Sequence, residues 1–74
     1  MQQKILDLLI KNKPAQGDLS SINNNIYSVV GYTISCLRKA DWPYSDLQLF
    51  REILMSLNDE NEVLRTCKNV LNFK

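Results

Sequence analysis

Few residues of this chain could carry out covalent or metal chemistry. The sequence contains no histidine and only two cysteines, Cys36 and Cys67. It therefore offers no histidine general base and no Ser-His or Cys-His nucleophile pair. Two thiols without histidine are also too few for a zinc site within one chain. Both cysteines fall in apolar stripes, which favours buried free thiols over a disulfide.

The other residues with chemical potential are better explained by local structure. The only glycines, Gly17 and Gly31, cannot form a phosphate loop or a dinucleotide fingerprint. Asp59, Glu60 and Glu62 lack the alternating ligands and central glycine of a calcium loop, and they suit the start of a helix. We therefore expect a protein that is not an enzyme, with no metal, no cofactor and no small-molecule substrate.

Composition indicates one small globular domain over residues 1–74. Its apolar fraction of 45% is ordinary for a folded protein. A chain of this size buries only about 60% of the surface that it exposes when unfolded, so self-association or a partner would add to its stability. No apolar run approaches the roughly 18–20 residues of a membrane span, and "ILDLLI" is too short for a secretory signal. We expect a cytoplasmic protein with no membrane association.

The net charge of +1 conceals a weak asymmetry. Residues 1–42 contain five basic and three acidic residues, whereas residues 43–74 contain four and five. A protein that relied on non-specific attraction to phosphates would usually be more basic.

Apolar residues recur with helical spacing and predict helices near 2–11, 26–40, 46–57 and 60–72. Pro14 ends the first of these helices. Ser45 and Gln48 resemble a capping box with Pro43 just outside, and Asp59 followed by Glu62 forms a similar pattern. No strand-like alternation is present, so the predicted class is all-α, with four or five helices.

Residues 15–40 allow two interpretations. The chain could break at "NNN" (23–25), with a short helix near 16–22, because asparagine forms helices poorly and suits tight turns. Alternatively, an unbroken apolar stripe from Leu19 to Ala40 could form one helix over 19–40. The first interpretation is slightly favoured.

The N-terminal half, residues 2–43, resembles winged-helix and related helix-turn-helix DNA-binding domains. The resemblance lies in "QQKILDLLIKNK", "DLSSI" and "VVGYTISCLRKADWP", which look like an opening helix, a supporting helix and a recognition helix. It implies a supporting helix with Leu19 and Ile22, and a recognition helix whose inward face is Val30, Ile34 and Leu37. Three departures concern the turn, which is one residue longer than the usual pattern, Asp41, where the family usually has glycine, and the region after Pro43. There we expect a C-terminal helical pair over 44–74 in place of the wing.

The resemblance implies that the outward positions of the recognition helix face DNA. The implied DNA-binding residues are Asn24, Asn25, Tyr27, Ser28, Gly31, Tyr32 and Ser35, with Lys13, Arg38 and Lys39 on phosphates. Within a helix, Gly31 is explained either by close packing of another helix or by close approach to DNA. Val63, Val70 and Phe73 are the expected dimer or partner contacts.

The sequence is compatible with two alternative functions. The first is a small sequence-specific DNA-binding transcriptional regulator that binds double-stranded DNA as a homodimer. The alternative is a non-enzymatic protein-binding helical module that docks on a larger partner as an inhibitor, adaptor or chaperone. Exposed aromatic residues such as Tyr27, Tyr32, Tyr44 or Phe73 would then be the anchors. Trp42 is expected to cover the core at a helix junction.

Overall fold

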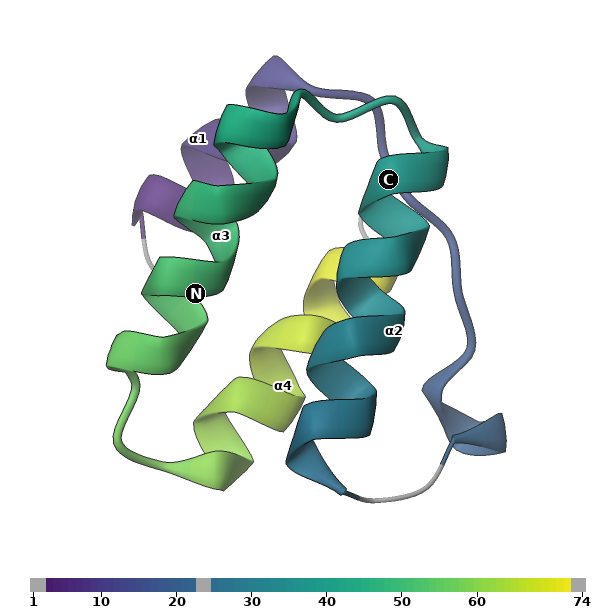
Figure 1. Cartoon of the computed structure of the whole chain (residues 1–74), viewed down its shortest axis with the longest axis vertical. Coiled ribbons are helices and arrows are strands. Elements are labelled where there is room, and N and C mark those ends of the chain that lie inside the picture. Colours follow the sequence, from purple (N-terminus) through teal and green to yellow (C-terminus); the bar gives the residue numbers. More distant parts are fainter. Residues whose placement is uncertain (1–2, 23–24, 73–74) are drawn as a thin grey trace.

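The computed structural model describes residues 3–22 and 25–72, and within them every regular element is helical (Figure 1). The predicted all-α class is therefore confirmed. The elements are α1 (Gln3–Lys11), a 3₁₀ turn η1 (Leu19–Ser21), α2 (Ile26–Lys39), α3 (Tyr44–Ser56) and α4 (Glu60–Leu71).

The four α-helices enclose one core. Helix α2 packs against α4 and α3, and α3 also packs against α1. In Figure 1, α1 and α3 lie on one side of the molecule, α2 lies on the other, and α4 crosses between them. The largest fully buried side chains come from all four helices: Ile5, Leu9, Thr33, Leu37, Phe50, Leu54, Cys67 and Val70.

Residues 19–40 form two elements rather than one helix. Asn25 is the N-cap of α2, with extended backbone angles (φ −64°, ψ 127°), and its side chain accepts a hydrogen bond from the Tyr27 amide at 2.8 Å. A side-chain oxygen at this position satisfies an amide that the helix itself leaves without a partner. The favoured interpretation of this segment is confirmed.

The element before α2 is shorter than predicted. Instead of a helix near 16–22 there is a three-residue 3₁₀ turn, capped by Asp18, which accepts from the Ser20 amide. Such a turn offers little surface for supporting a second helix. The helix-turn-helix-like character of residues 2–43 stays a prediction.

One predicted cap is wrong and another is confirmed. Helix α3 begins at Tyr44 with Pro43 at the N-cap position, so Ser45 is already inside the helix. Gln48 donates to the Tyr44 hydroxyl at 2.7 Å instead of completing a capping box. Proline suits this place because it needs no hydrogen-bond acceptor for an amide. Asp59 does cap α4, accepting from the Asn61 amide at 2.9 Å.

Helix α2 ends in a Schellman motif that turns the chain into α3. The amide of Asp41 donates to the carbonyl of Arg38, and the amide of Trp42 donates to the carbonyl of Leu37. Asp41 has a φ of 66°, the left-handed conformation that this motif requires and that glycine usually supplies. An aspartate tolerates this conformation better than most residues.

Trp42 joins three parts of the chain at this corner. Its side chain is only 4% exposed, and its ring meets Phe50 of α3 edge-on at 6.2 Å between centroids. The indole Nε1 donates to the carbonyl of Lys13 at 2.7 Å, which fixes the loop that follows α1. The expectation that Trp42 covers the core at a helix junction is confirmed.

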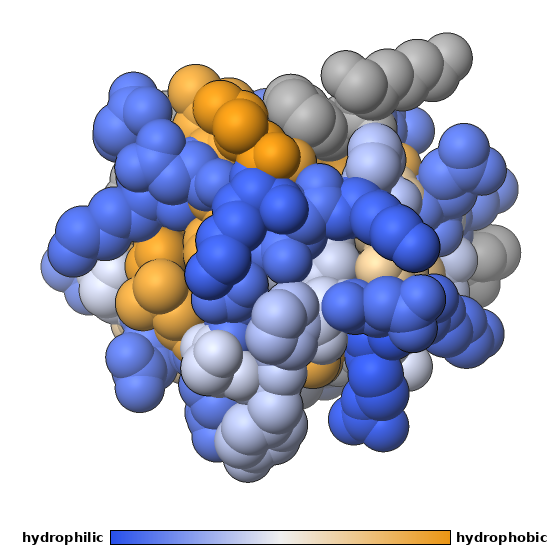
Figure 2. Space-filling view, turned by 90° about the horizontal axis from the view of Figure 1, so that it is seen from above, coloured by the Kyte–Doolittle hydropathy of each residue, from blue (hydrophilic) through white to orange (hydrophobic). Residues whose placement is uncertain are grey.

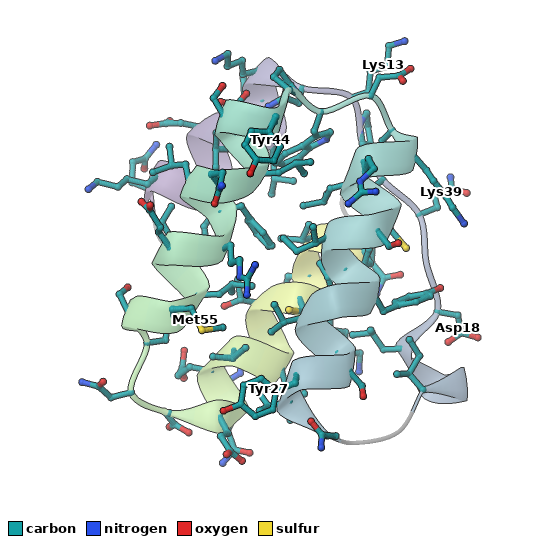
Figure 3. All side chains as sticks on the ribbon, in the orientation of Figure 1. Lys13, Asp18, Tyr27, Lys39, Tyr44 and Met55 are labelled. Atoms are coloured by element: carbon teal, nitrogen blue, oxygen red, sulfur yellow. The ribbon has the colours of Figure 1, made fainter. Side chains whose placement is uncertain are left out.

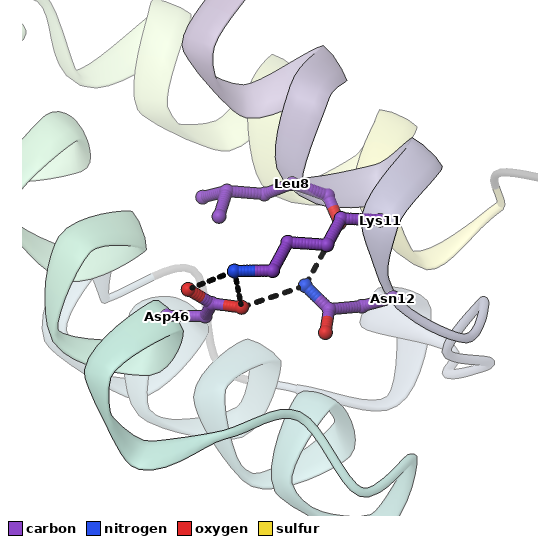
Figure 4. A network of polar contacts seen from close by, with 4 residues as sticks. All are labelled: Leu8, Lys11, Asn12 and Asp46. Atoms are coloured by element: carbon purple, nitrogen blue, oxygen red, sulfur yellow. Dashed lines mark hydrogen bonds and ion pairs between the residues drawn. The ribbon is translucent and has the colours of Figure 1, made fainter.

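A polar network joins the end of α1 to the start of α3 (Figure 4). Asp46 is only 6% exposed, and its carboxylate accepts from Asn12 at 3.0 Å and from Lys11 at 3.4 Å. Asn12 also donates to the Leu8 carbonyl at 2.9 Å near the end of α1. Because the Lys11 side chain stays 66% exposed, the shorter bond from Asn12 contributes more of the stabilisation.

Replacing Trp42 with phenylalanine should lower the free energy of unfolding by about 1–3 kcal/mol. The Lys13 carbonyl would lose its partner, and the smaller ring would leave space beside Phe50. Urea unfolding followed by circular dichroism measures the effect. Tyr44→Phe, at an exposed position, is the control and should stay within about 0.5 kcal/mol of the wild type. Equal stabilities of W42F and wild type would show that the corner does not depend on this side chain.

Candidate binding groove

The outward residues of α2 form one exposed face. Those that the sequence assigned to DNA binding and that are exposed on this helix are Tyr27, Ser28, Gly31, Ser35, Arg38 and Lys39. They share a face because residues three and four positions apart are neighbours on a helix. Tyr27, at the start of α2, is 78% exposed.

Three further predicted residues lie at the margins of this face or outside the described ranges. Asn25 caps the helix through its side chain. The Lys13 carbonyl accepts from Trp42, which brings Lys13 to the end of the molecule where α2 stops. Seen from that end, the surface is covered largely by hydrophilic side chains (Figure 2). Asn24 lies outside the described residues.

Tyr32 faces the preceding loop instead of lying on the exposed face. It is half-buried, and its hydroxyl accepts from the Asp18 amide at 3.0 Å. Gly17 lies beneath it: a Cβ added there would be 2.9 Å from the Cys36 Sγ and 3.1 Å from the Tyr32 ring. Tyr32 thus contacts the loop, its expected role in DNA binding stays a prediction, and Gly17 is explained by close packing.

Gly31 has no such explanation within the chain. Apart from its chain neighbours and the adjacent backbone of α2, a Cβ added to it would meet no atom of the described residues within 4 Å. Of the two explanations offered for Gly31, close packing by another helix is not supplied by the described residues of this chain. A glycine inside a helix costs about 0.5–1 kcal/mol relative to alanine, and here no internal contact offsets that cost.

Gly31 instead borders a groove between α2 and α3. Its volume is about 340 Å³, and it is lined on α2 by Val30, Gly31, Ile34 and Arg38 and on α3 by Arg51 and Met55. A second hollow of about 260 Å³ shares Ile34, Arg38 and Arg51 with it and continues to Leu47 and Tyr44. Because they share these residues, we refer to the two hollows together as the α2–α3 groove. Figure 3 shows Tyr27 and Tyr44 toward its opposite ends and Met55 on the α3 side.

The charges along the α2–α3 groove all have one sign. Arg38 and Arg51 line both hollows, whereas no aspartate or glutamate of the described residues lines either of them. Within residues 3–22 and 25–72, neither arginine forms an ion pair with a carboxylate. Both guanidinium groups are thus available to an anionic group that enters the groove.

The residues expected to contact a partner through α4 lie elsewhere. Val63 and Val70 are 5% and 0% exposed, because they belong to the apolar face that α4 turns toward the core. Neither side chain lines the α2–α3 groove, and their expected role as dimer or partner contacts gains no support from this position. Phe73 lies outside the described residues, and a homodimer stays a prediction.

A further hollow lies near the 3₁₀ turn. It lies between Gly17, Asp18, Ser20 and the end of α4 near Lys68. The carboxylate of Asp18 accepts from both the hydroxyl and the amide of Ser20, and these bonds lower the pKa of Asp18. Since the turn itself uses this carboxylate, the hollow offers little that points to a ligand.

The two cysteines are free and buried, as predicted. Burial raises the pKa of the Cys67 thiol, an effect that a hydrogen bond with Thr33 partly opposes. A raised pKa disfavours the thiolate, which is the reactive form. In the part of the chain that the structure describes, no three histidine, cysteine, aspartate or glutamate side chains gather as metal ligands.

Comparison with protein families, curated proteins and solved structures gives no match for this chain. The resemblance of residues 2–43 to helix-turn-helix domains therefore stays a prediction. None of the helices in the described ranges is both long enough and apolar enough to span a lipid bilayer.

Sequence reasoning missed Arg51 and Met55 as members of the groove, and it interpreted Val30 and Ile34 only as inward-facing. The spacing of α3 gave no sign that its Arg51 face lies opposite α2. The one available signal was Gly31, a helix-weakening residue in the middle of an otherwise good helix.

Substituting alanine at the two glycines should have opposite effects on stability. Gly31→Ala should raise the free energy of unfolding by about 0.5–1 kcal/mol, because the methyl group enters open space and alanine favours helix. Gly17→Ala should lower it by about 1–3 kcal/mol through overlap with Cys36 and Tyr32. Urea midpoints of the two variants measure the difference. A destabilised Gly31→Ala variant would contradict the open environment described for Gly31.

Proposed function

We propose that this chain is a non-enzymatic protein-binding module that holds a segment of a partner protein in the α2–α3 groove. The observation that carries the proposal is Gly31, which weakens α2, has no packing role among the described residues and opens onto the groove. A glycine at this position leaves the helix backbone open to close approach by a binding partner.

The chemistry of the groove supports a protein partner. Its floor is apolar, formed by Val30, Ile34 and Leu47. Met55 is 52% exposed and Tyr44 75% exposed at its margins. Exposed tyrosines supply much of the binding energy in many protein interfaces, and methionine adapts its shape to varied partners.

DNA binding is the second candidate, and one observation favours it. Arg38 and Lys39 lie at the exposed C-terminal end of α2, and the Trp42–Lys13 hydrogen bond brings Lys13 to the same end. These are the three residues that the resemblance assigns to phosphates. Two features weigh against this candidate. The supporting element is only a 3₁₀ turn, and the exposed face of α2 has no basic residue before Arg38.

We also propose a cytosolic location, supported by the two free cysteines, because thiols persist as such in reducing compartments.

Blocking the groove tests the proposal. Gly31→Trp should place a large side chain in the α2–α3 groove without disturbing the core, because its Cβ meets open space. Ser28→Trp is the matched control, since Ser28 is exposed on the same helix but does not line the groove. Proteins retained from the source cell's extract by immobilised wild type and S28W should be lost on G31W, with at least a tenfold drop in affinity for the purified partner. Equal retention by G31W would contradict the proposal.

A fluorescence titration against random and native-locus duplex DNA at low and moderate salt tests the second candidate. Locus-specific binding that weakens steeply with salt and is lost in Lys39→Ala would establish DNA binding in place of the proposal. The proposal expects no locus preference at micromolar protein. Thermal unfolding of each variant confirms that it is folded.

A further inference from the structure

The α2–α3 groove has a charge that its own chain does not neutralise. Arg38 from α2 and Arg51 from α3 line both hollows of the groove. Neither forms an ion pair within the described ranges, and no acidic side chain of those ranges lines the groove. Two guanidinium groups placed this way attract carboxylates, which arginine binds through two parallel hydrogen bonds.

The walls of the groove suit a helix better than an extended strand. A strand adds to a neighbour through unpaired backbone amides and carbonyls, which the interiors of α2 and α3 do not offer. A helix is held instead by apolar side chains placed in a groove, and here Ile34 and Val30 provide the floor. Gly31 and Ser35, one turn apart and both lining the groove, are small enough for a second helix to approach closely.

The length of the groove sets the size of the occupant. Tyr27 and Arg38 both line it and are 11 positions apart on α2. At about 1.5 Å per residue this distance is about 16 Å, which three turns of a helix would cover. An occupant of that length presents apolar residues every three or four positions to the floor, with flanking carboxylates within reach of both arginines.

We infer that the α2–α3 groove binds an acidic amphipathic helix of a partner protein, an inference that rests on the protein-binding function proposed above. Phosphates of a nucleic acid would also attract the two arginines, but a duplex has no apolar face to bury against Val30, Ile34 and Leu47. The combination of an apolar floor with two unneutralised arginines favours a segment that carries both leucine-like side chains and carboxylates.

Selection from a random library of 16-residue peptides displayed on phage tests this inference with no partner chosen in advance. The wild-type protein is the target, and sequences that also bind Gly31→Trp are discarded so that only groove-dependent binders remain. The expected result is enrichment of peptides with apolar residues at helical spacing and with aspartate or glutamate beside them. The charge-reversed double variant R38E/R51E should instead enrich lysine and arginine. Both arginines are exposed, so the double variant should retain its fold, as circular dichroism and thermal unfolding would verify.

Direct titration of one selected acidic peptide adds a quantitative measurement. Its affinity should fall at least tenfold in Arg51→Glu and change less than twofold in Arg65→Glu. Arg65 is also exposed but lies on α4 and does not line the groove. Groove-dependent peptides without acidic enrichment would overturn the acidic helix and leave the proposed protein-binding function standing. Recovery of no groove-dependent peptide would overturn both.

Discussion

The burial of Trp42 is the constraint on which the rest of the structure depends. A chain of 74 residues has little apolar surface to bury, and this one indole is shared by three segments. Its ring packs against Phe50, its Nε1 holds the loop at Lys13, and its own amide helps to close α2 at Leu37. Since α2 and α3 are joined at this corner, the packing of Trp42 helps to position the two helices that line the α2–α3 groove. The candidate site therefore depends on a residue outside it.

The two glycines show how the same residue type serves opposite purposes in one small fold. Gly17 lets the loop lie directly against Tyr32 and Cys36, and its cost in chain entropy is offset by packing. Gly31 receives no such compensation, because nothing in the described chain approaches it. Domains of this size have a small margin of stability, so the uncompensated cost at Gly31 is consistent with the proposed approach of a partner.

The helices and most of the core could be predicted from the sequence, because apolar spacing reports which side of a helix is buried. The break before α2 was predictable for a similar reason, since Asn25 is a good cap and a poor helix former. The pattern at Ser45 and Gln48 gave a wrong start for α3. The helix begins at Tyr44, directly after Pro43, because proline can begin a helix without a capping box. Val63 and Val70 were assigned to a partner although their spacing placed them on the core face of α4. The groove was not predictable, because it depends on how α2 and α3 are placed relative to each other. The apolar spacing within each helix carries no information about that placement.

The chemistry of the α2–α3 groove suits the recognition of an anionic partner, as proposed above. Arginine stays protonated at physiological pH and therefore cannot act as a general base. Among the described residues, the only other ionisable side chains that line the groove are the tyrosines at its two ends. Fixed positive charges beside an apolar floor can attract and orient an anionic apolar segment. The apolar floor then supplies binding energy, while the two arginines select the sign of the partner's charge and its alignment along α2.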